Sequence, residues 1–301
     1  MKRRESTPQA FALKLALPVI AFMLVMMSYP LLYALWLSFR EVSFFGGIHS
    51  DYVGLANYEK VLGSGEFWWS TGVTLRFTVE TVVLAIAIGL ALALVMHKVK
   101  RGSAALRTVV ILPWSVSLYA AGVAWSYLAR GQSGIGTALY NALRGTTTVE
   151  SAVEVPFINS HWIVELLAVG NAWNMAPLVA FFLLANLQAI PTRLYDLAAL
   201  DRLTVWERFV HVTLPPLRYT LFVFTSICTI LSMKLLDFIF VMTAGGPGDA
   251  STTLTFKLYD LAFRQTNMGY SAAMSFFLLF MIIAATLLLY VFWGRREGAQ
   301  A

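Results

Sequence analysis

Six long, nearly uninterrupted apolar stretches divide the chain. Each is about as long as the roughly 20 residues that a helix needs to cross a bilayer. Their apolar residues run continuously and do not alternate with polar ones, which favours helices over the strands of a β-barrel. The pattern therefore predicts an all-α integral membrane protein with six transmembrane helices. The approximate spans are 13–38, 73–96, 107–128, 161–187, 219–243 and 271–293.

The most polar long interval between two spans is Leu194–Pro216, between the fourth and the fifth. A first helix is expected to begin near Pro191, where a proline at a first helical position is tolerated, and to end at about Asp201. A second helix is expected to begin at Thr204, because Thr204 and Glu207 have the spacing of a capping box. The interval therefore predicts a helix pair outside the bilayer.

One face of the second helix is apolar, because several of its residues recur at helical spacing. They are Trp206, Phe209, Val210 and Thr213. This face is expected to press against a partner protein or against the bilayer surface.

The composition agrees with a membrane protein, and the charges orient it. Of the 301 residues, 58% are hydrophobic and 13% are charged, against about 25% charged in soluble domains. With the N-terminus inside, 13 of the 22 Lys and Arg residues lie on the cytoplasmic side, six lie outside, and Lys14, Arg76 and Lys234 lie within or at the edges of spans. By the positive-inside rule, both termini and the helix pair are expected in the cytoplasm. The net charge of +6 thus reflects topology, and no nucleic acid is expected as a partner.

These features predict a cytoplasmic tail over 1–12, a transmembrane domain over 13–293 with its polar loop at about 190–217, and a second cytoplasmic tail over 294–301. The N-terminal Met-Lys-Arg-Arg and the apolar run after it resemble a secretory signal. However, the run extends past Leu37 without a small-residue cleavage site, so an uncleaved first span is expected. The only cysteine, Cys228, excludes an intrachain disulfide and is expected to serve packing.

Two pairs of opposite charges fall inside the spans. Arg76 and Glu80 are four residues apart and share a helical face, which predicts a mutually neutralised pair near the outer edge. A proton or ion pathway is the alternative, since buried charge also marks such pathways. Lys234 and Asp237 are three residues apart and predict an intramembrane ion pair, because either charge alone in lipid would cost at least a few kcal/mol.

Motifs for chemistry are missing from the sequence. It contains no G-x-x-x-x-G-K-[ST] loop for nucleotide phosphates, no H-E-x-x-H, no G-x-S-x-G and no paired cysteines at metal-ligand spacing. The histidines are scattered at His49, His97, His161 and His211. We therefore expect no catalytic, cofactor-binding or metal site, and the chain is not expected to be an enzyme.

The polar interval resembles the cytoplasmic EAA loop of permease subunits in binding-protein-dependent ABC importers of the carbohydrate (maltose and glycerol-phosphate) type. The family pattern of E-A-A, then D-G-A, then a hydrophobic residue and L-P is matched here by Asp196–Ala198, Asp201–Leu203 and Val212–Pro215. Arg202 stands where the family usually has glycine, the residue that relieves a tight turn. The positions that the resemblance assigns to ATPase coupling are Asp196, Ala198, Ala199, Asp201, Arg202, Leu214 and Pro215.

Further motifs of the same family follow in order along most of the chain. Gly54–Tyr58 is similar to its GLxNY signature and Leu112-Pro113 to the Leu-Pro of its third span. Trp173–Pro177 resembles W-x-x-x-P, Thr243–Gly248 resembles TxGGP, and Gly269–Ser275 resembles GYxAAxS.

The resemblance implies a membrane-spanning permease subunit of an ATP-driven importer for a carbohydrate. It implies as partners a second homologous permease, two copies of a separate ATPase, an external solute-binding protein, the carbohydrate substrate and membrane lipid, and it implies no cofactor. The polar loop would be the coupling loop. The family's translocation cavity, between spans four and five, corresponds here to Asn171, Trp173, Asn174, Leu178, Leu231, Ser232 and Leu235.

Amides and hydroxyls at these positions suit a polyhydroxylated ligand, because each both donates and accepts hydrogen bonds. With Lys234 neutralised by Asp237, a neutral sugar or oligosaccharide is expected. A glycerol-phosphate-like anion is the alternative solute, with Lys234 as its ligand. An ion-coupled secondary transporter that uses Arg76, Glu80, Lys234 and Asp237 is the alternative class, and a membrane scaffold is a third. Secondary transporters usually contain two internal repeats with broken helices, and the sequence shows no such repeat.

Overall fold

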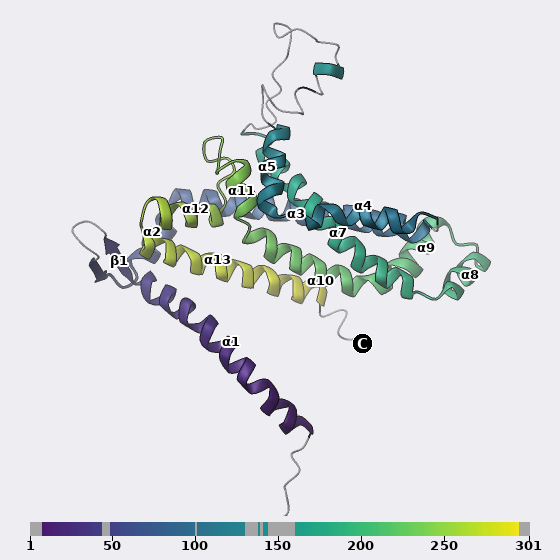
Figure 1. Ribbon diagram of the computed structural model, residues 1–301, viewed down its shortest axis with the longest axis horizontal. Helices are drawn as coiled ribbons and strands as arrows, with labels where there is room; N and C mark the ends of the chain where they lie inside the picture. Colours follow the sequence, from purple (N-terminus) through teal and green to yellow (C-terminus); the bar gives the residue numbers. More distant parts are fainter. Residues whose placement is uncertain are drawn as a thin grey trace, which may run out of the picture. The chain divides into compact units, whose positions relative to one another are not determined.

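The computed structural model describes residues 8–43, 49–99, 101–129, 138, 141–143 and 160–294 (Figure 1). The chain forms two compact units. One comprises Met1–Ser64 and Leu258–Phe277, and the other comprises Gly65–Lys257 and Leu278–Ala301. The last long helix, α13 (Met268–Leu289), therefore contributes residues to both units and is followed by the π-helical turn η4 (Tyr290–Gly294).

The first unit contains the N-terminal helix and a short β-hairpin. Its elements are α1 (Pro8–Ser38), β1 (Arg40–Ser43), β2 (His49–Tyr52), α2 (Ala56–Gly63), η3 (Asp260–Arg264) and the start of α13. Helix α1 continues through Pro18 and Pro30, and 0% of its most apolar window is buried. Because α1 begins at Pro8, part of the predicted tail over 1–12 is helical. The rest of both predicted tails, 1–7 and 295–301, lies outside the described residues.

Two family-like motifs meet at one carbonyl group in this unit. The buried amide of Asn57 donates to the carbonyl oxygens of Ser38 and Arg40, both at 2.9 Å, and so ties α2 to the end of α1. Gly269 lies against the same Arg40 oxygen, with which a Cβ at this position would collide. The two motifs, far apart in sequence, therefore both have a packing reason.

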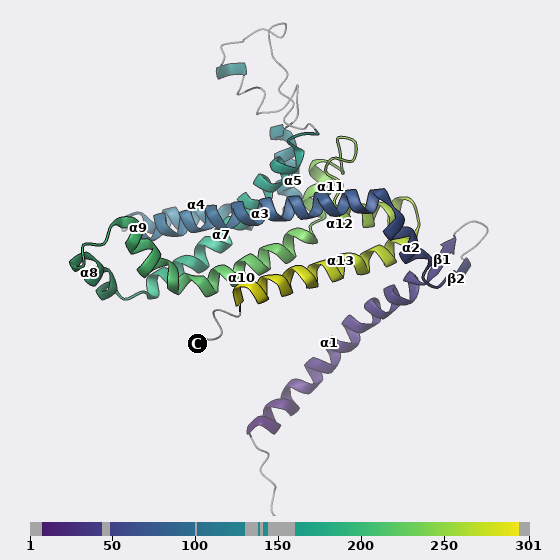
Figure 2. The ribbon, with the colours of Figure 1, turned by 180° about the vertical axis from the view of Figure 1, so that it is seen from behind.

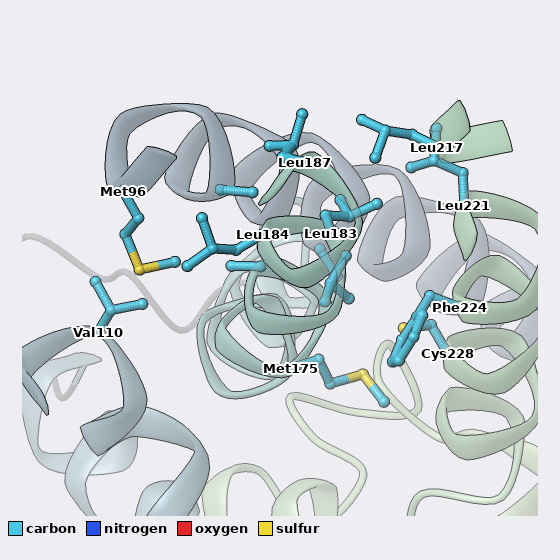
Figure 3. Packing of buried hydrophobic residues seen from close by; sticks show 14 of the residues in the cluster. Met96, Val110, Met175, Leu183, Leu184, Leu187, Leu217, Leu221, Phe224 and Cys228 are labelled. Atoms are coloured by element: carbon cyan, nitrogen blue, oxygen red, sulfur yellow. The ribbon is translucent and has the colours of Figure 1, made fainter. Parts of the chain in front are cut away.

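The second unit is built on two long helices that lie side by side. Figures 1 and 2 show α3 (Gly65–Lys98) and α7 (Ile163–Ala189) together, with α10 (Leu214–Met233) packed along them. At Gly89 of α3, a Cβ would lie 2.7 Å from the Val179 side chain of α7, so only glycine permits this close approach. The apolar core around this contact is drawn in Figure 3, and it includes Met96, Met175, Leu183, Leu184, Leu187, Leu217, Leu221 and Phe224.

The predicted third span is not one helix. It consists of α4 (Ser103–Ser115) and α5 (Leu118–Ala129), which are bent by 93° at the break between them (Figure 1). Helix α4 passes through Pro113 and ends two residues later, at Ser115, and Val116 and Ser117 separate it from α5. The Asn174 amide of α7 donates to the carbonyl oxygens of Pro113 at 2.7 Å and Val116 at 3.2 Å, and Pro113 O also accepts from Val116 N at 3.3 Å.

The predicted fifth span, 219–243, also differs from the structure. Helix α10 begins earlier, at Leu214, and ends at Met233, and a separate short helix, α11 (Asp237–Met242), follows after a break. The other four predicted spans are confirmed as α1, α3, α7 and α13. Among the described residues, five helices are long and apolar enough to cross a membrane, and the bent α4–α5 pair makes a sixth span, so the six-span architecture is confirmed.

The family-like motif Thr243–Gly248 leads from α11 into α12 (Leu254–Tyr259). Gly245 has a φ of +85°, and a Cβ there would lie 2.6 Å from the ring of Phe256. The N–H of Leu254 donates to the Thr74 hydroxyl of α3 at 2.9 Å, which fastens this connection to the long helix.

We predict that Asn174→Leu destabilises the protein by about 1–3 kcal/mol, because a substitution of similar size removes the side-chain donor of Val116 O and leaves Pro113 O with only the 3.3 Å bond from Val116 N. Thermal unfolding of the detergent-purified chain measures the loss. Asn186→Leu is the matched control, since its amide donates only to Phe182 O of its own helix, at 3.0 Å. Equal Tm values for the two variants would contradict the role assigned to Asn174.

Candidate functional site

The predicted helix pair is present. It consists of α8 (Thr192–Leu200), α9 (Val205–Arg208) and the π-helical turn η2 (Phe209–Thr213), which runs into α10. The capping box is confirmed, because the Thr204 hydroxyl accepts from Glu207 N at 3.3 Å and the Glu207 carboxylate accepts from Thr204 N at 2.7 Å. These two local bonds fix the start of the second helix.

The turn between the two helices is tight although it contains no glycine. Leu203 N donates to Ala198 O at 3.0 Å and Arg202 N donates to Ala199 O at 3.1 Å, which is the pattern of a Schellman motif. Arg202 occupies the left-handed position of this motif, with a φ of +55°. The chain therefore forms the turn that the family usually builds with glycine, at the cost of a strained residue.

The helix pair presents apolar side chains to its surroundings. Leu197 is 45% and Leu200 is 77% exposed on α8, and Trp206 is 70% exposed on α9. Leu197 and Leu200 lie outside the helices that could cross a membrane, whereas Trp206 lies at the start of one of them, Val205–Met233. Large exposed apolar groups outside such helices are typical of a protein-binding surface. Of the positions assigned to coupling, Ala198 is buried, Leu214 and Pro215 are half-buried, and Asp196, Ala199, Asp201 and Arg202 are exposed.

The structure brings together some of the predicted cavity residues. The Asn171 amide of α7 donates to the Ser232 hydroxyl of α10 at 3.4 Å, and both side chains are buried. Trp173 is 40% exposed and stands edge-on to Trp125, with ring centroids 6.2 Å apart. Asn174 instead donates to backbone carbonyl oxygens at the break between α4 and α5. Leu178 and Leu231 are half-buried, and Leu235 is buried in the loop after α10.

A large cavity lies elsewhere in the second unit. Its volume is about 1050 Å³, and it opens between α3, α10 and the end of α13 with η4. Its lining is mainly apolar and includes Val82, Leu221 and Trp293, with Arg218 and Thr225 among its polar groups. None of the predicted cavity residues lines this cavity.

The two ion pairs predicted from the sequence differ in whether the structure contains them. Arg76 and Glu80 form the predicted ion pair, with Nε 2.9 Å from Oε1, and Arg76 also pairs with Glu165 of α7. No local sequence pattern predicts Glu165 as a partner, because it lies 89 residues from Arg76. Lys234 and Asp237 are not among the ion pairs of the described residues, and both side chains are exposed. Because α10 ends at Met233, the two residues do not share a helix face, so the basis of that prediction is wrong.

Comparison with known proteins identifies the family. The family described as "Binding-protein-dependent transport system inner membrane component" matches residues 85–296, which is more than half of the chain. The chain belongs to this family. It is therefore an inner membrane permease subunit of an ABC transporter and not an enzyme. The ion-coupled secondary transporter and the scaffold are thereby excluded.

Similar proteins extend over nearly the whole permease. The trehalose/maltose transport system permease protein MalF of Thermococcus litoralis is 33% identical over 283 residues, covering 93% of this chain and 92% of its own. The sn-glycerol-3-phosphate transport system permease protein UgpA of Rhizobium meliloti is 32% identical and covers 94% of each chain. A bacterial alginate ABC transporter, solved with an alginate pentasaccharide-bound periplasmic protein, has a chain of the same fold, with a TM-score of 0.78, 18% identity, and coverage of 93% of this chain and 92% of that chain.

We predict that Arg202→Gly stabilises the permease by about 0.5–1 kcal/mol. Glycine removes the left-handed strain of about 1–2 kcal/mol, and its greater freedom in the unfolded chain offsets part of that gain. The measurement is the Tm in detergent. The nearby, exposed and helical Ala199→Gly is the control, and it should lower the Tm, because glycine is unfavourable in a regular helix. A lower Tm for Arg202→Gly would show that the arginine makes a stabilising contact of its own.

Proposed function

We propose that this permease forms the translocation path for a neutral sugar or oligosaccharide and that the α8–α9 pair couples this path to a separate ATPase dimer. The observation that carries the proposal is the geometry of the pair. A capping box and a Schellman turn hold two short helices rigidly, while Asp196, Leu197 and Leu200 stay exposed. A rigid, exposed helix pair can transmit movement of a docked protein to α7 and α10, between which it is inserted.

The proposal includes a second homologous permease, an external solute-binding protein and a cytoplasmic position of both termini. The family description, with its binding-protein dependence, and the periplasmic protein in the alginate transporter complex support the partners. The excess of Lys and Arg on the predicted inner side supports the orientation. The division into a transmembrane domain over 13–293 with a coupling loop at about 190–217 is part of the same proposal.

A neutral sugar is supported by the names of relatives and by the polar groups between α7 and α10. The Thermococcus litoralis relative is a trehalose/maltose permease. Asn171 and Ser232 are uncharged, and amide and hydroxyl groups both donate to and accept from sugar hydroxyls. Asn171, Trp173, Leu178, Leu231, Ser232 and Leu235 remain the proposed solute-facing set, whereas Asn174 has a structural partner.

One observation favours a second candidate solute, a glycerol-phosphate-like anion. Lys234 is exposed at the end of α10 and has no ion-pair partner among the described residues, so its charge is available to a phosphate. The Rhizobium meliloti relative, a glycerol-3-phosphate permease, is 32% identical. Because α10 ends at Met233, Lys234 and Asp237 do not share a helical face, and the expectation that Asp237 neutralises Lys234 loses its basis.

Charge reversal in the helix pair tests coupling. Asp196→Lys should leave the permease in the membrane but lower solute-stimulated ATP hydrolysis of the purified transporter by at least about tenfold, because it places a cation in an interface selected for an anion. Asp196→Asn is the matched control of similar size and should reduce stimulation less. Undiminished stimulation in Asp196→Lys would remove the α8–α9 pair from the coupling role.

Competition for uptake separates the two solutes. We expect neutral disaccharides to inhibit solute uptake by competition and sn-glycerol 3-phosphate not to inhibit it. Lys234→Gln should leave the apparent affinity for the sugar within about threefold of the unmodified permease, because a charge that contacts no solute contributes little to binding. If only the phosphorylated compound competes, and Lys234→Gln abolishes that competition, the solute is the anion. In that case the neutral-sugar proposal fails.

A further inference from the structure

We propose that the groove between the C-terminal end of α3 and the α8–α9 pair binds an anionic phospholipid, with the phosphate at its basic rim and acyl chains on its apolar wall. The groove has a volume of about 800 Å³. It is lined by α3, the end of α7, α8, α9 and η2, all in the second unit. The residues on which the coupling proposal rests, Asp196, Leu197 and Leu200, do not line this space.

The rim of the groove is cationic. Lys98 and Arg208 supply its positive charge, His97 lies beside them, and the lining contains no acidic side chain. Among the described residues, none of these three side chains forms an ion pair. A phosphate group would therefore meet unneutralised positive charge at this point.

Arg208 has unused hydrogen-bonding capacity. Its Nε is buried and has no hydrogen-bond partner, and its Nη2 reaches only Leu203 O, at 3.5 Å. A buried N–H without an acceptor is unfavourable, and a guanidinium presents its donors in a geometry that matches phosphate oxygens. A phosphate in the groove would supply the missing acceptor.

The wall of the groove is aromatic and aliphatic. Trp206 and Phe209, whose ring centroids are 5.7 Å apart, line it together with Leu94, Leu187 and Val205. Three members of the apolar face predicted from the sequence, Trp206, Phe209 and Thr213, thus turn towards one space, while Val210 does not line it. Tryptophan beside basic residues is typical of the level where a membrane span meets the lipid headgroups.

The position of the groove at the end of α3 agrees with a lipid site. Helix α3 has 34 residues, so at about 1.5 Å per residue it is longer than the roughly 30 Å of hydrocarbon in a bilayer. Leu94 lies inside this helix and Lys98 ends it, so the lining passes from apolar span to basic helix end within about one turn. An amphiphile matches both halves, whereas a free anion would leave the apolar wall in water.

A protein partner fits this groove less well than it fits another face of the same helix pair. The exposed leucines of α8, Leu194, Leu197 and Leu200, are absent from the lining. An ATPase that contacts those leucines would bind to side chains that are not part of the groove lining. The two surfaces can therefore be occupied at the same time.

The test uses thermal unfolding of the full-length permease in detergent with added short-chain lipid. Dioctanoyl phosphatidylglycerol should raise the Tm by at least about 3 °C near saturation, because it binds the folded protein selectively. Dioctanoyl phosphatidylcholine, with the same chains and no net charge, should raise it clearly less. Inorganic phosphate at equal concentration should leave it unchanged.

Paired variants locate the binding. Lys98→Gln with Arg208→Gln should weaken the response to dioctanoyl phosphatidylglycerol by at least about tenfold in concentration, because charge-assisted bonds to the phosphate are lost. Arg101→Gln with Arg193→Gln is the matched control, which removes the same charge from exposed positions outside the groove. If the first double variant does not fold, Lys98→Gln alone, at an exposed position, takes its place.

Four results would overturn the proposal. They are an equal Tm rise with phosphatidylcholine, a full rise with inorganic phosphate, an unchanged response in the groove variants, and competitive displacement of phosphatidylglycerol by the transporter's ATPase subunit. The last result would assign the groove to a protein. None of these measurements depends on transport, so the proposed solute can fail while the lipid site stands, and the reverse also holds.

Discussion

The second unit depends on the requirement that backbone groups inside a membrane find partners within the protein. A continuous helix satisfies this requirement by itself, but the break between α4 and α5 does not. The Asn174 amide supplies a hydrogen-bond donor at this break and donates to Pro113 O and Val116 O. The Thr74 hydroxyl accepts from the N–H of Leu254 at the start of α12, which lies between the candidate spans. Polar side chains on the two long helices thus bond to backbone groups both at the break in a span and in a connection between spans.

Features that depend on local chemistry could be predicted from the sequence. The capping box at Thr204 and Glu207 and the pairing of Arg76 with Glu80 involve residues three or four positions apart, and both are present. The long apolar spans follow from composition alone. In these cases, the residues that decide the structure lie within one or two helical turns of each other.

Features that depend on tertiary contacts were not predicted. Hydropathy does not distinguish a straight span from one bent by 93°, because the apolar residues continue through the break at residues 116 and 117. The end of α10 at Met233 likewise interrupts an apolar run, and it separates Lys234 from Asp237. Asn174, expected to face a solute, instead bonds to a backbone 58 to 61 residues earlier in the chain. No spacing rule reaches that far.

The contact between Gly89 and Val179 has a mechanical consequence. The side chain of Val179 occupies the space that a Cβ at position 89 would need, and one turn away on α3 the residues Ala85 and Ala93 do carry a Cβ. Sliding of α3 along α7 would therefore bring Val179 against these side chains, so the contact opposes such sliding. The bending of this unit is left to the breaks at residues 116–117 and 234–236, where few helical bonds have to be broken.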